Sequence, residues 1–322
     1  MELNVPAACA VVVNPSKVPD LEAFRDTVTR TLDAAGWPAP TWYETTPEDP
    51  GRGQATEAME NGAEVVFAAG GDGTVMACVT ALAETDVALA ILPAGTGNLL
   101  AANLGLAADL DTGLRVAIEG GLRRLDVGRT EGSCFAVMAG LGFDAKMLDS
   151  TSETTKKRIG WPAYIIGAAK HLRDRPMRVT IRIDDRPPIR RRARTVLIAN
   201  VGRLQGGVRL LEAADPADGK LDVAVLSPRS LPQWVALGWG IVRRKERVPS
   251  LEVFRAATVE IIATHAEPRQ LDGDTIDPGT RLHAEILPKA LWLCVPEPAD
   301  HPDLSEDVDA VAERAKRLTS AG

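Results

Sequence analysis

The segment Glu64–Thr74 (EVVFAAGGDGT) contains the residues of this chain best suited to bind a phosphate group. It predicts a buried strand, a tight turn and the start of a helix, and the turn comprises Gly70, Gly71, Asp72, Gly73 and Thr74. Glycine lets the backbone approach a ligand closely, and the N–H groups and dipole at a helix N-terminus favour an anion. A carboxylate such as Asp72 would repel phosphate unless a cation lay between them, which suggests Mg²⁺.

Two further turns follow the same plan. The apolar run Val87–Leu92 leads into Pro93–Asn98 (PAGTGN), whose candidate binding residues are Gly95, Thr96, Gly97 and Asn98. The apolar run Ala10–Val13 leads into Asn14 and Pro15. Such turns would lie together at the carboxyl edge of a parallel sheet, where open α/β folds bind ligands. One glycine turn alone could be a plain connection, but several in register favour a phosphate role. The chain has neither a P-loop pattern nor GxGxxG after its first strand.

A pair of carboxylates lies in Gln270–Thr275 (QLDGDT), where Asp272 and Asp274 flank a glycine. On a strand their side chains would face the same side, and around a glycine turn they would converge. Two carboxylates this close need a metal, a proton or a hydrogen-bond donor. A solvated turn is the alternative, since Asp-Gly is a common turn pair.

The two motifs GGDGT and PAGTGN together resemble the diacylglycerol kinase catalytic domain and its relatives, the sphingosine kinases and bacterial lipid kinases. The resemblance runs from about Cys9 to Pro296. GGDGT alone is shared with NAD kinases and some phosphofructokinases. PAGTGN and the DGD at Asp272 favour the lipid-kinase branch.

The resemblance implies a catalytic role for three aspartates. Asp272 would join Asp72 in holding the catalytic Mg²⁺ network, and Asp274 would be the general base. Mg²⁺ would neutralise the phosphates of ATP while a carboxylate accepts the proton of the substrate hydroxyl. Relatives usually carry glutamate where this chain has Asp274, so the shorter base would act through water or from a shifted backbone.

The resemblance also implies a structural Mg²⁺ at Asp215–Leu221 (DPADGKL), held by Asp215, Asp218 and the backbone carbonyl of Lys220. The alternative is a simple turn before a strand, which Asp-Gly fits equally well.

Single residues of the nucleotide site carry over as well. Asn14 matches the asparagine of the family's NP turn, although the glycine that usually follows is missing from NPSKV. Thr45 matches a threonine that contacts the nucleotide, with Thr46 as a competing alignment. Leu99 stands where the family often has aspartate after GTGN, which leaves lipid acceptors other than diacylglycerol open.

The order of the elements predicts two domains. Residues 1–124 alternate strand and helix, which predicts an α/β nucleotide-binding domain with a parallel sheet and helices on both faces. Residues 125–297 contain short strand-like runs and predict an antiparallel β-sandwich that would bind the lipid. Among these runs are Cys134–Met138, Leu282–Leu287 and Leu291–Val295. A polar helix is expected at 303–318 and could pack back on the first domain.

Composition narrows the class of protein. The 322 residues are 45% hydrophobic, which is enough for two domains. The sequence contains no run of about 18 apolar residues, so we expect no transmembrane helix. The N-terminus lacks a basic start, so we expect no signal peptide. The four cysteines form no CxxC pair, so we expect them to pack in the core of a protein in the reducing cytoplasm.

Charge is unevenly distributed along the chain. Between Leu125 and Arg255 there are 24 Lys and Arg against 14 Asp and Glu, although the whole chain has a net charge of −7. The densest basic run is Arg186–Arg194. The chain has only 4% aromatic residues and no nucleic-acid motif. We therefore expect the basic region to bind an anionic membrane surface and not nucleic acid. A solvated strand edge is the alternative.

Two helical segments interrupt the predicted sandwich. Trp161–Leu172 is markedly apolar, and Leu231–Val242 carries two tryptophans followed by Arg243, Arg244 and Lys245. The second segment suits a helix at a membrane interface, or alternatively a helix packed on the sandwich. Tryptophan at an exposed position would favour the interface.

The sequence therefore predicts an ATP- and Mg²⁺-dependent lipid kinase on the cytoplasmic side of a membrane, with diacylglycerol as the first candidate acceptor. A kinase of a sphingoid base or of NAD is one alternative. A nucleotide- or membrane-binding module without activity is the other, but retention of Asp72, Asp272 and Asp274 argues against it. The sequence leaves the oligomeric state open.

Overall fold

The chain forms two compact units. The computed structural model describes residues 5–94, 99–104, 106, 109–142, 176–202, 211, 214–243 and 248–296. The first unit ends at Val127, the second runs from Gly128 to Pro288, and the chain returns to the first unit at Lys289. The last strand residues therefore belong to the first unit, whereas the sequence-based division assigned them to the second.

Some predicted features lie outside the described residues. These are the terminal helix at 303–318, the apolar segment Trp161–Leu172 and the glycine-turn residues Gly95, Thr96, Gly97 and Asn98.

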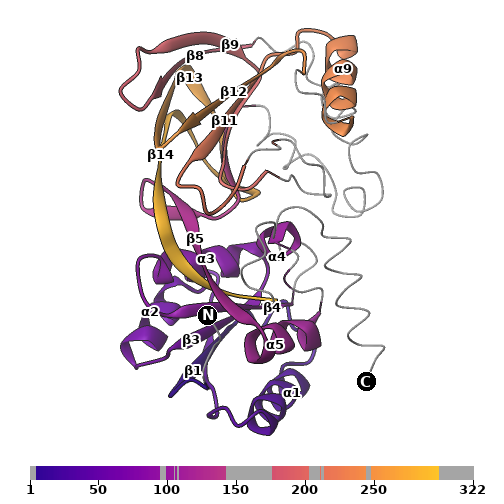
Figure 1. The fold of residues 1–322 in the computed structure, drawn as a ribbon, viewed down its shortest axis with the longest axis vertical. Helices are drawn as coiled ribbons and strands as arrows, with labels where there is room; N and C mark the ends of the chain where they lie inside the picture. The colour runs from indigo at the N-terminus through magenta and orange to yellow at the C-terminus, as the bar shows by residue number, and fades with distance from the viewer. Residues whose placement is uncertain are drawn as a thin grey trace. The chain divides into compact units, whose positions relative to one another are not determined.

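The first unit alternates strands and helices (Figure 1). In chain order its elements are β1 (Cys9–Val13), α1 (Leu21–Ala34), β2 (Thr41–Glu44), α2 (Arg52–Glu60), β3 (Val65–Gly70), α3 (Asp72–Leu82), β4 (Ala88–Pro93), α4 (Leu99–Leu104), α5 (Leu110–Glu119) and the first part of β5 (Gly121–Thr130). The sheet has the strand order β14-β4-β3-β1-β2, and neighbouring strands in this order run parallel. The predicted parallel sheet is confirmed.

Helices cover both faces of this sheet. On one face, α1 and α5 pack together, and their residues Val28, Leu32 and Leu114 join the core formed with Val11 and Phe67. Helices α2 and α3 pack together and also contact β1 and β3. All four cysteines are buried and none forms a disulfide, as expected of core residues.

The second unit is built from antiparallel strands (Figure 1). Its elements are the end of β5, β6 (Ser133–Phe135), β7 (Met138–Gly142), β8 (Met177–Ile183), β9 (Ile189–Ala193), β10 (Thr195–Ala199), β11 (Leu221–Leu226), α9 (Leu231–Val242), β12 (Leu251–Ala256), β13 (Thr258–Leu271) and the first part of β14 (Asp274–Val295). Strands β12, β11, β10, β7 and β13 are neighbours in that order, and β13 also pairs with β8 and β14.

Strand β13 joins two groups of strands within the second unit. Val259–Ala263 pairs with β8, whereas Arg269–Leu271 pairs with β7, and the register shifts between these stretches. Side chains of β7, β8, β10, β11, β13 and β14 form one apolar core. Such a change of partner at a bulge is how a strand can contribute to both layers of a sandwich.

Two strand predictions were wrong in detail. The run Cys134–Met138 is not one strand, because β6 ends at Phe135 and β7 begins at Met138. The runs Leu282–Leu287 and Leu291–Val295 are not separate, because β14 continues through both. Strands β5, β9 and β12 were missed, since their many charged residues hide the apolar alternation.

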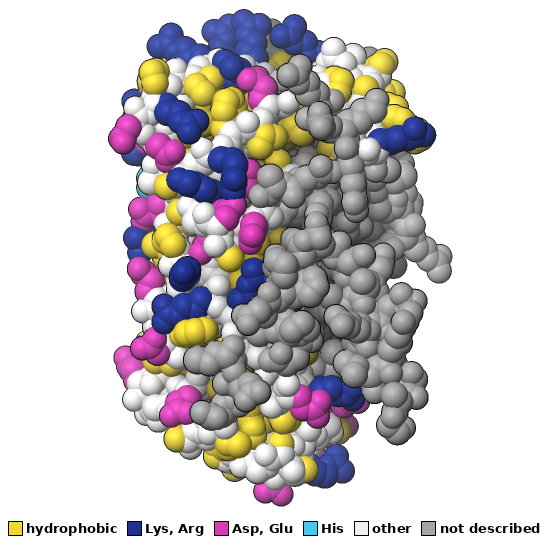
Figure 2. All heavy atoms as spheres, in the orientation of Figure 1, with side chains coloured by type: hydrophobic (Ala, Val, Ile, Leu, Met, Phe, Trp, Pro, Cys, Tyr) yellow, Lys and Arg dark blue, Asp and Glu magenta, His cyan; other side chains and the backbone are white. Residues whose placement is uncertain are grey.

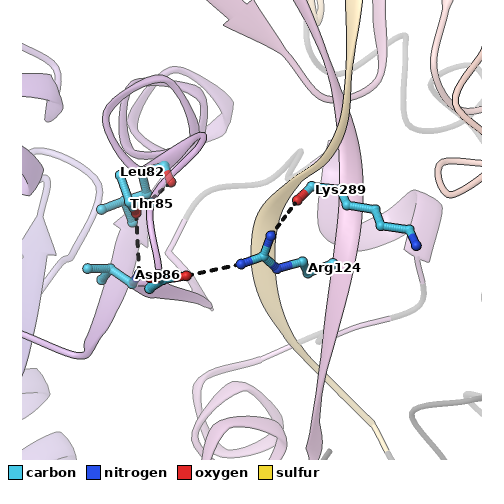
Figure 3. Close-up of polar contacts among 6 residues, drawn as sticks. Leu82, Thr85, Asp86, Arg124 and Lys289 are labelled. Atoms are coloured by element: carbon cyan, nitrogen blue, oxygen red, sulfur yellow. Dashed lines mark hydrogen bonds and ion pairs between the residues drawn. The ribbon is translucent and has the colours of Figure 1, made fainter.

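The return of β14 into the first unit is held by side chains of β5 (Figure 3). Arg124 donates to the Lys289 carbonyl at 3.3 Å and to the Asp86 carboxylate at 3.0 Å, and its guanidinium carbon lies 4.6 Å from the Trp292 ring centroid. The buried Asp126 accepts from the Lys289 N–H at 2.7 Å. Lys289 has a φ of 52°, so these contacts hold an unfavourable backbone conformation in place.

We expect Arg124→Ala to lower the free energy of unfolding by about 2 kcal/mol, because it removes a charged hydrogen bond to a carbonyl and a cation–π contact. Asp86→Asn is the matched control. The Asp86 side chain is 96% exposed, so its loss should cost less than about 0.5 kcal/mol. Urea denaturation of both variants tests this, and equal losses would instead assign the stabilisation to the ion pair.

Candidate active site

The first glycine turn leaves the N-terminus of α3 open. Gly71 occupies the N-cap position in an extended conformation, and it supplies no side-chain hydrogen bond to the helix. A Cβ at Gly71 would meet no heavy atom of the described residues within 4 Å, so these residues leave space beside the turn. The first N–H groups of an α-helix have no partner within the helix, and at such an end they can bind an anion.

At the N-termini of α1, α2 and α5, by contrast, an aspartate accepts hydrogen bonds from the first N–H groups. Asp20 accepts from the Ala23 N–H of α1, and Asp109 accepts from the Thr112 N–H of α5. Asp49 accepts from the N–H groups of Arg52 and Gly53 at the start of α2. These carboxylates occupy the place that a bound anion would take. At the N-cap of α3 no side chain does so, which leaves this helix end able to bind an external anion.

Packing explains the glycine and threonine of the turn. A Cβ at Gly70 would lie 2.5 Å from the Thr74 hydroxyl oxygen, so only glycine fits there while Thr74 keeps its place. Thr74 is itself 2% exposed. Asp72 and Gly73 lie in the first turn of α3, whereas the sequence predicted that they belong to the turn before the helix. All five residues from Gly70 to Thr74 lie at one strand–helix junction, as predicted.

The other predicted turns start beside this one. The Asn14 N–H donates to the Ala69 carbonyl at 2.8 Å, and the Asn14 side chain accepts from the N–H and hydroxyl of Ser16. Gly70 pairs in register with Pro93, the last residue of β4. The ends of β1, β3 and β4 therefore lie at one edge of the sheet, as predicted for a ligand-binding edge.

Thr45 and Thr46 differ in their surroundings. Thr45 is 7% exposed, and its N–H donates to the Val13 carbonyl, directly before Asn14. Thr46 is exposed and accepts from the Asp49 N–H, so it helps to shape the start of α2. The position beside the NP turn favours Thr45 as the nucleotide contact, which stays a prediction.

In the second unit, Asp272 and Gly273 form the turn between β13 and β14. Their φ angles are 46° and 95°, and Leu271 pairs with Asp274 across the turn. Two successive residues with positive φ are the signature of a tight two-residue hairpin. Of the two arrangements that the sequence left open, the structure contains the turn.

The Asp272 carboxylate anchors the segment between β6 and β7. One oxygen accepts from the N–H groups of Val137 and Met138 at 2.9 and 2.6 Å, and the other accepts from the Ala136 N–H at 2.8 Å. Asp272 is 2% exposed. This contact explains the wrong strand prediction, because these three N–H groups turn toward a carboxylate instead of pairing with a strand.

Asp274 has a different environment from Asp272. It begins β14 and is exposed, and desolvation by the surrounding protein raises the pKa of its carboxyl above the usual value. Gly273 between them donates to the buried Gln270 side chain at 2.9 Å. Asp272 is therefore a buried structural group, whereas Asp274 is an accessible group with a raised pKa.

At the predicted structural Mg²⁺ site, an arginine supplies the positive charge. The Arg255 guanidinium forms an ion pair with the Asp218 carboxylate and lies 3.8 Å from Asp222, whose pKa burial raises to about 6. Asp215 and Asp218 also accept from backbone N–H groups of their own turn, including that of Lys220. Arg255 gave no signal in the sequence, since it lies 37 residues from Asp218.

The contacts of the predicted metal ligands differ from one aspartate to another. Among the described residues, no group of three or more His, Cys, Asp and Glu could hold a metal ion. The Asp272 oxygens already accept three N–H groups, which leaves at most one of the carboxylate's roughly four acceptor sites for a metal. Asp72 does fit a cation bound together with phosphate, since it lies in the first turn of α3.

Comparison with known proteins identifies the family to which this chain belongs. Residues 8–130 match the model described as diacylglycerol kinase catalytic domain, and residues 136–295 match the YegS C-terminal NAD kinase beta sandwich-like domain. The "Probable lipid kinase YegS-like" of Chromohalobacter salexigens is 33% identical over 258 residues, covering 76% of this chain and 79% of that protein. The chain belongs to the YegS-like family of lipid kinases. The "Probable lipid kinase YegS" of Escherichia fergusonii is 32% identical and covers 74% and 81% of the two chains.

Solved structures agree with this family in fold. A diacylglycerol kinase from Bacillus anthracis superposes with a TM-score of 0.68 at 18% identity, covering 92% of this chain and 99% of that one. An NAD kinase from Archaeoglobus fulgidus in complex with ATP gives a TM-score of 0.51 at 13% identity, covering 98% and 100%. The predicted α/β domain with a β-sandwich is confirmed, and among the described residues no helix is long and apolar enough to span a bilayer.

The role of Asp272 predicts a large difference between two otherwise similar substitutions. Asp272→Asn should lower the free energy of unfolding by about 3 kcal/mol, because the amide group faces a backbone N–H that has lost its acceptor. Asp274→Asn should change it by less than about 0.5 kcal/mol, because this residue is exposed. Urea denaturation measures both, and an unchanged stability of Asp272→Asn would contradict the anchoring role.

Proposed function

We propose that this chain is an ATP- and Mg²⁺-dependent kinase that phosphorylates a lipid hydroxyl, with diacylglycerol as acceptor and phosphatidic acid as product. The observation that carries the proposal is the N-terminus of α3, which has a glycine at the N-cap position. A helix end of this kind suits a triphosphate. The lipid acceptor is supported by the names of the relatives that share this chain's family.

The nucleotide would bind along the carboxyl edge of the parallel strands. The turn Gly70–Thr74 would orient the phosphates through its N–H groups, next to Asn14, Pro15 and Thr45. Gly95, Thr96, Gly97 and Asn98 would contribute from the second glycine turn. Mg²⁺ bound near Asp72 would offset the charge of the phosphates.

Asp274 would act as the general base that accepts the proton of the acceptor hydroxyl. A raised pKa makes a carboxylate a stronger base, provided that it is ionised at the working pH. Desolvation raises the pKa of Asp274 in this sense. Asp272 would act as a positioning residue, because it fixes the turn from which Asp274 projects.

Phosphoryl transfer from γ-labelled ATP tests the proposal, with diacylglycerol, sphingosine and NAD offered separately. We expect label in phosphatidic acid, and a loss of about 10²–10⁴-fold in kcat for Asp274→Asn. Below the raised pKa of Asp274, kcat should fall as the pH decreases, because the protonated carboxyl cannot accept a proton. Label on sphingosine or NAD, and not on diacylglycerol, would show that the proposed acceptor is wrong. Bound ATP with no transfer to any acceptor would favour a module without activity.

A second prediction tests the anion site on α3. Gly71→Asp should place a carboxylate at the N-cap, in a conformation and space that accept a side chain. It should keep or slightly raise the melting temperature, because aspartate is a good N-cap, while weakening ATP binding at least about tenfold.

The reverse exchange in α5 is the control for this variant. Asp109→Gly should lower stability by a few tenths of a kcal/mol and leave ATP binding unchanged. Calorimetric titration with ATP and thermal melting give the two readouts. Normal ATP affinity in a folded Gly71→Asp variant would remove α3 from the nucleotide site.

A further inference from the structure

Helix α9 has an apolar surface on both of its faces. Trp234, Leu237 and Ile241 are 6%, 0% and 5% exposed and hold the helix on the second unit. Leu231, Val235 and Trp239 are 39%, 47% and 55% exposed. Residues four apart lie on the same face of a helix, so these three form one continuous line, here called the α9 stripe.

The α9 stripe is unusual for a helix whose outer face meets water. Such a face normally carries charged or polar residues, but Leu231–Val242 contains no charged residue. Five large hydrophobic side chains are strongly exposed among the described residues, and three of them belong to the stripe. A concentration of exposed apolar groups on one element indicates an interaction site.

The charges around the α9 stripe are positive. Arg229 precedes the helix and Arg243 follows it, with the Arg243 guanidinium carbon 4.5 Å from the Trp239 ring centroid. The sequence continues with Arg244 and Lys245. Figure 2 shows hydrophobic side chains gathered over α9 with basic side chains beside them. An apolar line with arginines at both ends is complementary to a layer that has an apolar interior and negatively charged groups at its surface.

A second basic element belongs to the same unit. On the β8–β9 hairpin, Arg178 lies directly opposite Arg192 in register, and both are exposed, as is Arg190. Figure 2 shows basic side chains collected over this hairpin. Like charges placed directly opposite destabilise a strand pair, so their presence favours an anionic partner for this unit.

We propose that the α9 stripe docks this chain onto an anionic phospholipid bilayer. Leu231, Val235 and Trp239 enter the interfacial layer, and Arg229 and Arg243 pair with lipid phosphates. Amphipathic tryptophan and arginine are suited to this layer. The inference deepens the proposed function, on which it rests, because it describes how the kinase reaches an acceptor that lies in a membrane.

Charge favours a bilayer over a second copy of the chain. In a two-fold dimer the same patch faces itself, so the arginines at the ends of one stripe would meet those of the other or lie over uncharged surface. The segment Pro228–Arg243 holds no acidic residue to pair with them. Lipid phosphate supplies the missing negative charge at every position along the helix.

Vesicle flotation without ATP or diacylglycerol tests the docking by itself. The vesicles contain phosphatidylcholine alone, or equal parts of phosphatidylcholine and phosphatidylglycerol. We expect binding to the mixed vesicles, weakened about tenfold by Trp239→Ser. Arg243→Gln should weaken it about fivefold, equivalent to about 1 kcal/mol for one basic residue, and only on the anionic vesicles.

Val5→Ser is the matched control, because Val5 is 58% exposed and belongs to the first unit. It should bind like the unchanged chain. Thermal melting verifies that Trp239→Ser is folded. The proposal is overturned if the unchanged chain does not float with anionic vesicles, or if Trp239→Ser floats equally well. It is also overturned if sedimentation velocity shows a dimer that Trp239→Ser dissociates, since the stripe would then bind a second copy.

A separate readout distinguishes this proposal from the proposed function. Transfer to a short-chain, water-soluble diacylglycerol should be the same for Trp239→Ser and the unchanged chain, because this acceptor needs no membrane. Stripe-dependent flotation without transfer to any acceptor would support the docking and contradict the kinase. Transfer to the soluble acceptor without any flotation would support the kinase and contradict the docking.

Discussion

The backbone pairing of β14 is the constraint on which both units depend. Its first part pairs antiparallel with β13, and its last part pairs parallel with β4. Pairing satisfies backbone N–H and C=O groups in both stretches, so one continuous strand contributes to the hairpin at Asp274 and to the parallel sheet. Arg124 and Asp126 hold the point at which the strand enters the first unit.

Carboxylates in this molecule act mainly by accepting backbone N–H groups. Asp20, Asp49 and Asp109 cap helices, and Asp272 anchors the β6–β7 segment. Both α2 and α3 have a glycine at the N-cap, but at α2 the Asp49 carboxylate accepts from the first N–H groups, whereas at α3 the N-cap supplies no side-chain acceptor. An uncapped helix end would cost stability in an ordinary scaffold, and a triphosphate that supplies the missing acceptors gives a physical reason for it.

A lipid acceptor creates a problem of access that a soluble acceptor does not. The hydroxyl to be phosphorylated lies at a membrane surface, whereas the described helices are too short or too polar to enter a bilayer as spans. Peripheral docking by a few exposed apolar and basic side chains would resolve this, since such contacts are individually weak and reversible. The α9 stripe has that composition.

The sequence by itself determined the two-domain class and the candidate phosphate turn, because apolar runs, glycine spacing and helix signals are local. Family membership then followed from GGDGT and PAGTGN together. Only the tertiary structure decided that Asp272 is a buried anchor while Asp274 stays accessible, since three donors from a distant segment surround one of them. It also decided that Arg255 lies at Asp218 and that Trp239 faces outward while Trp234 is buried. Burial and long-range pairing depend on what packs nearby, which neighbouring residues in the chain do not specify.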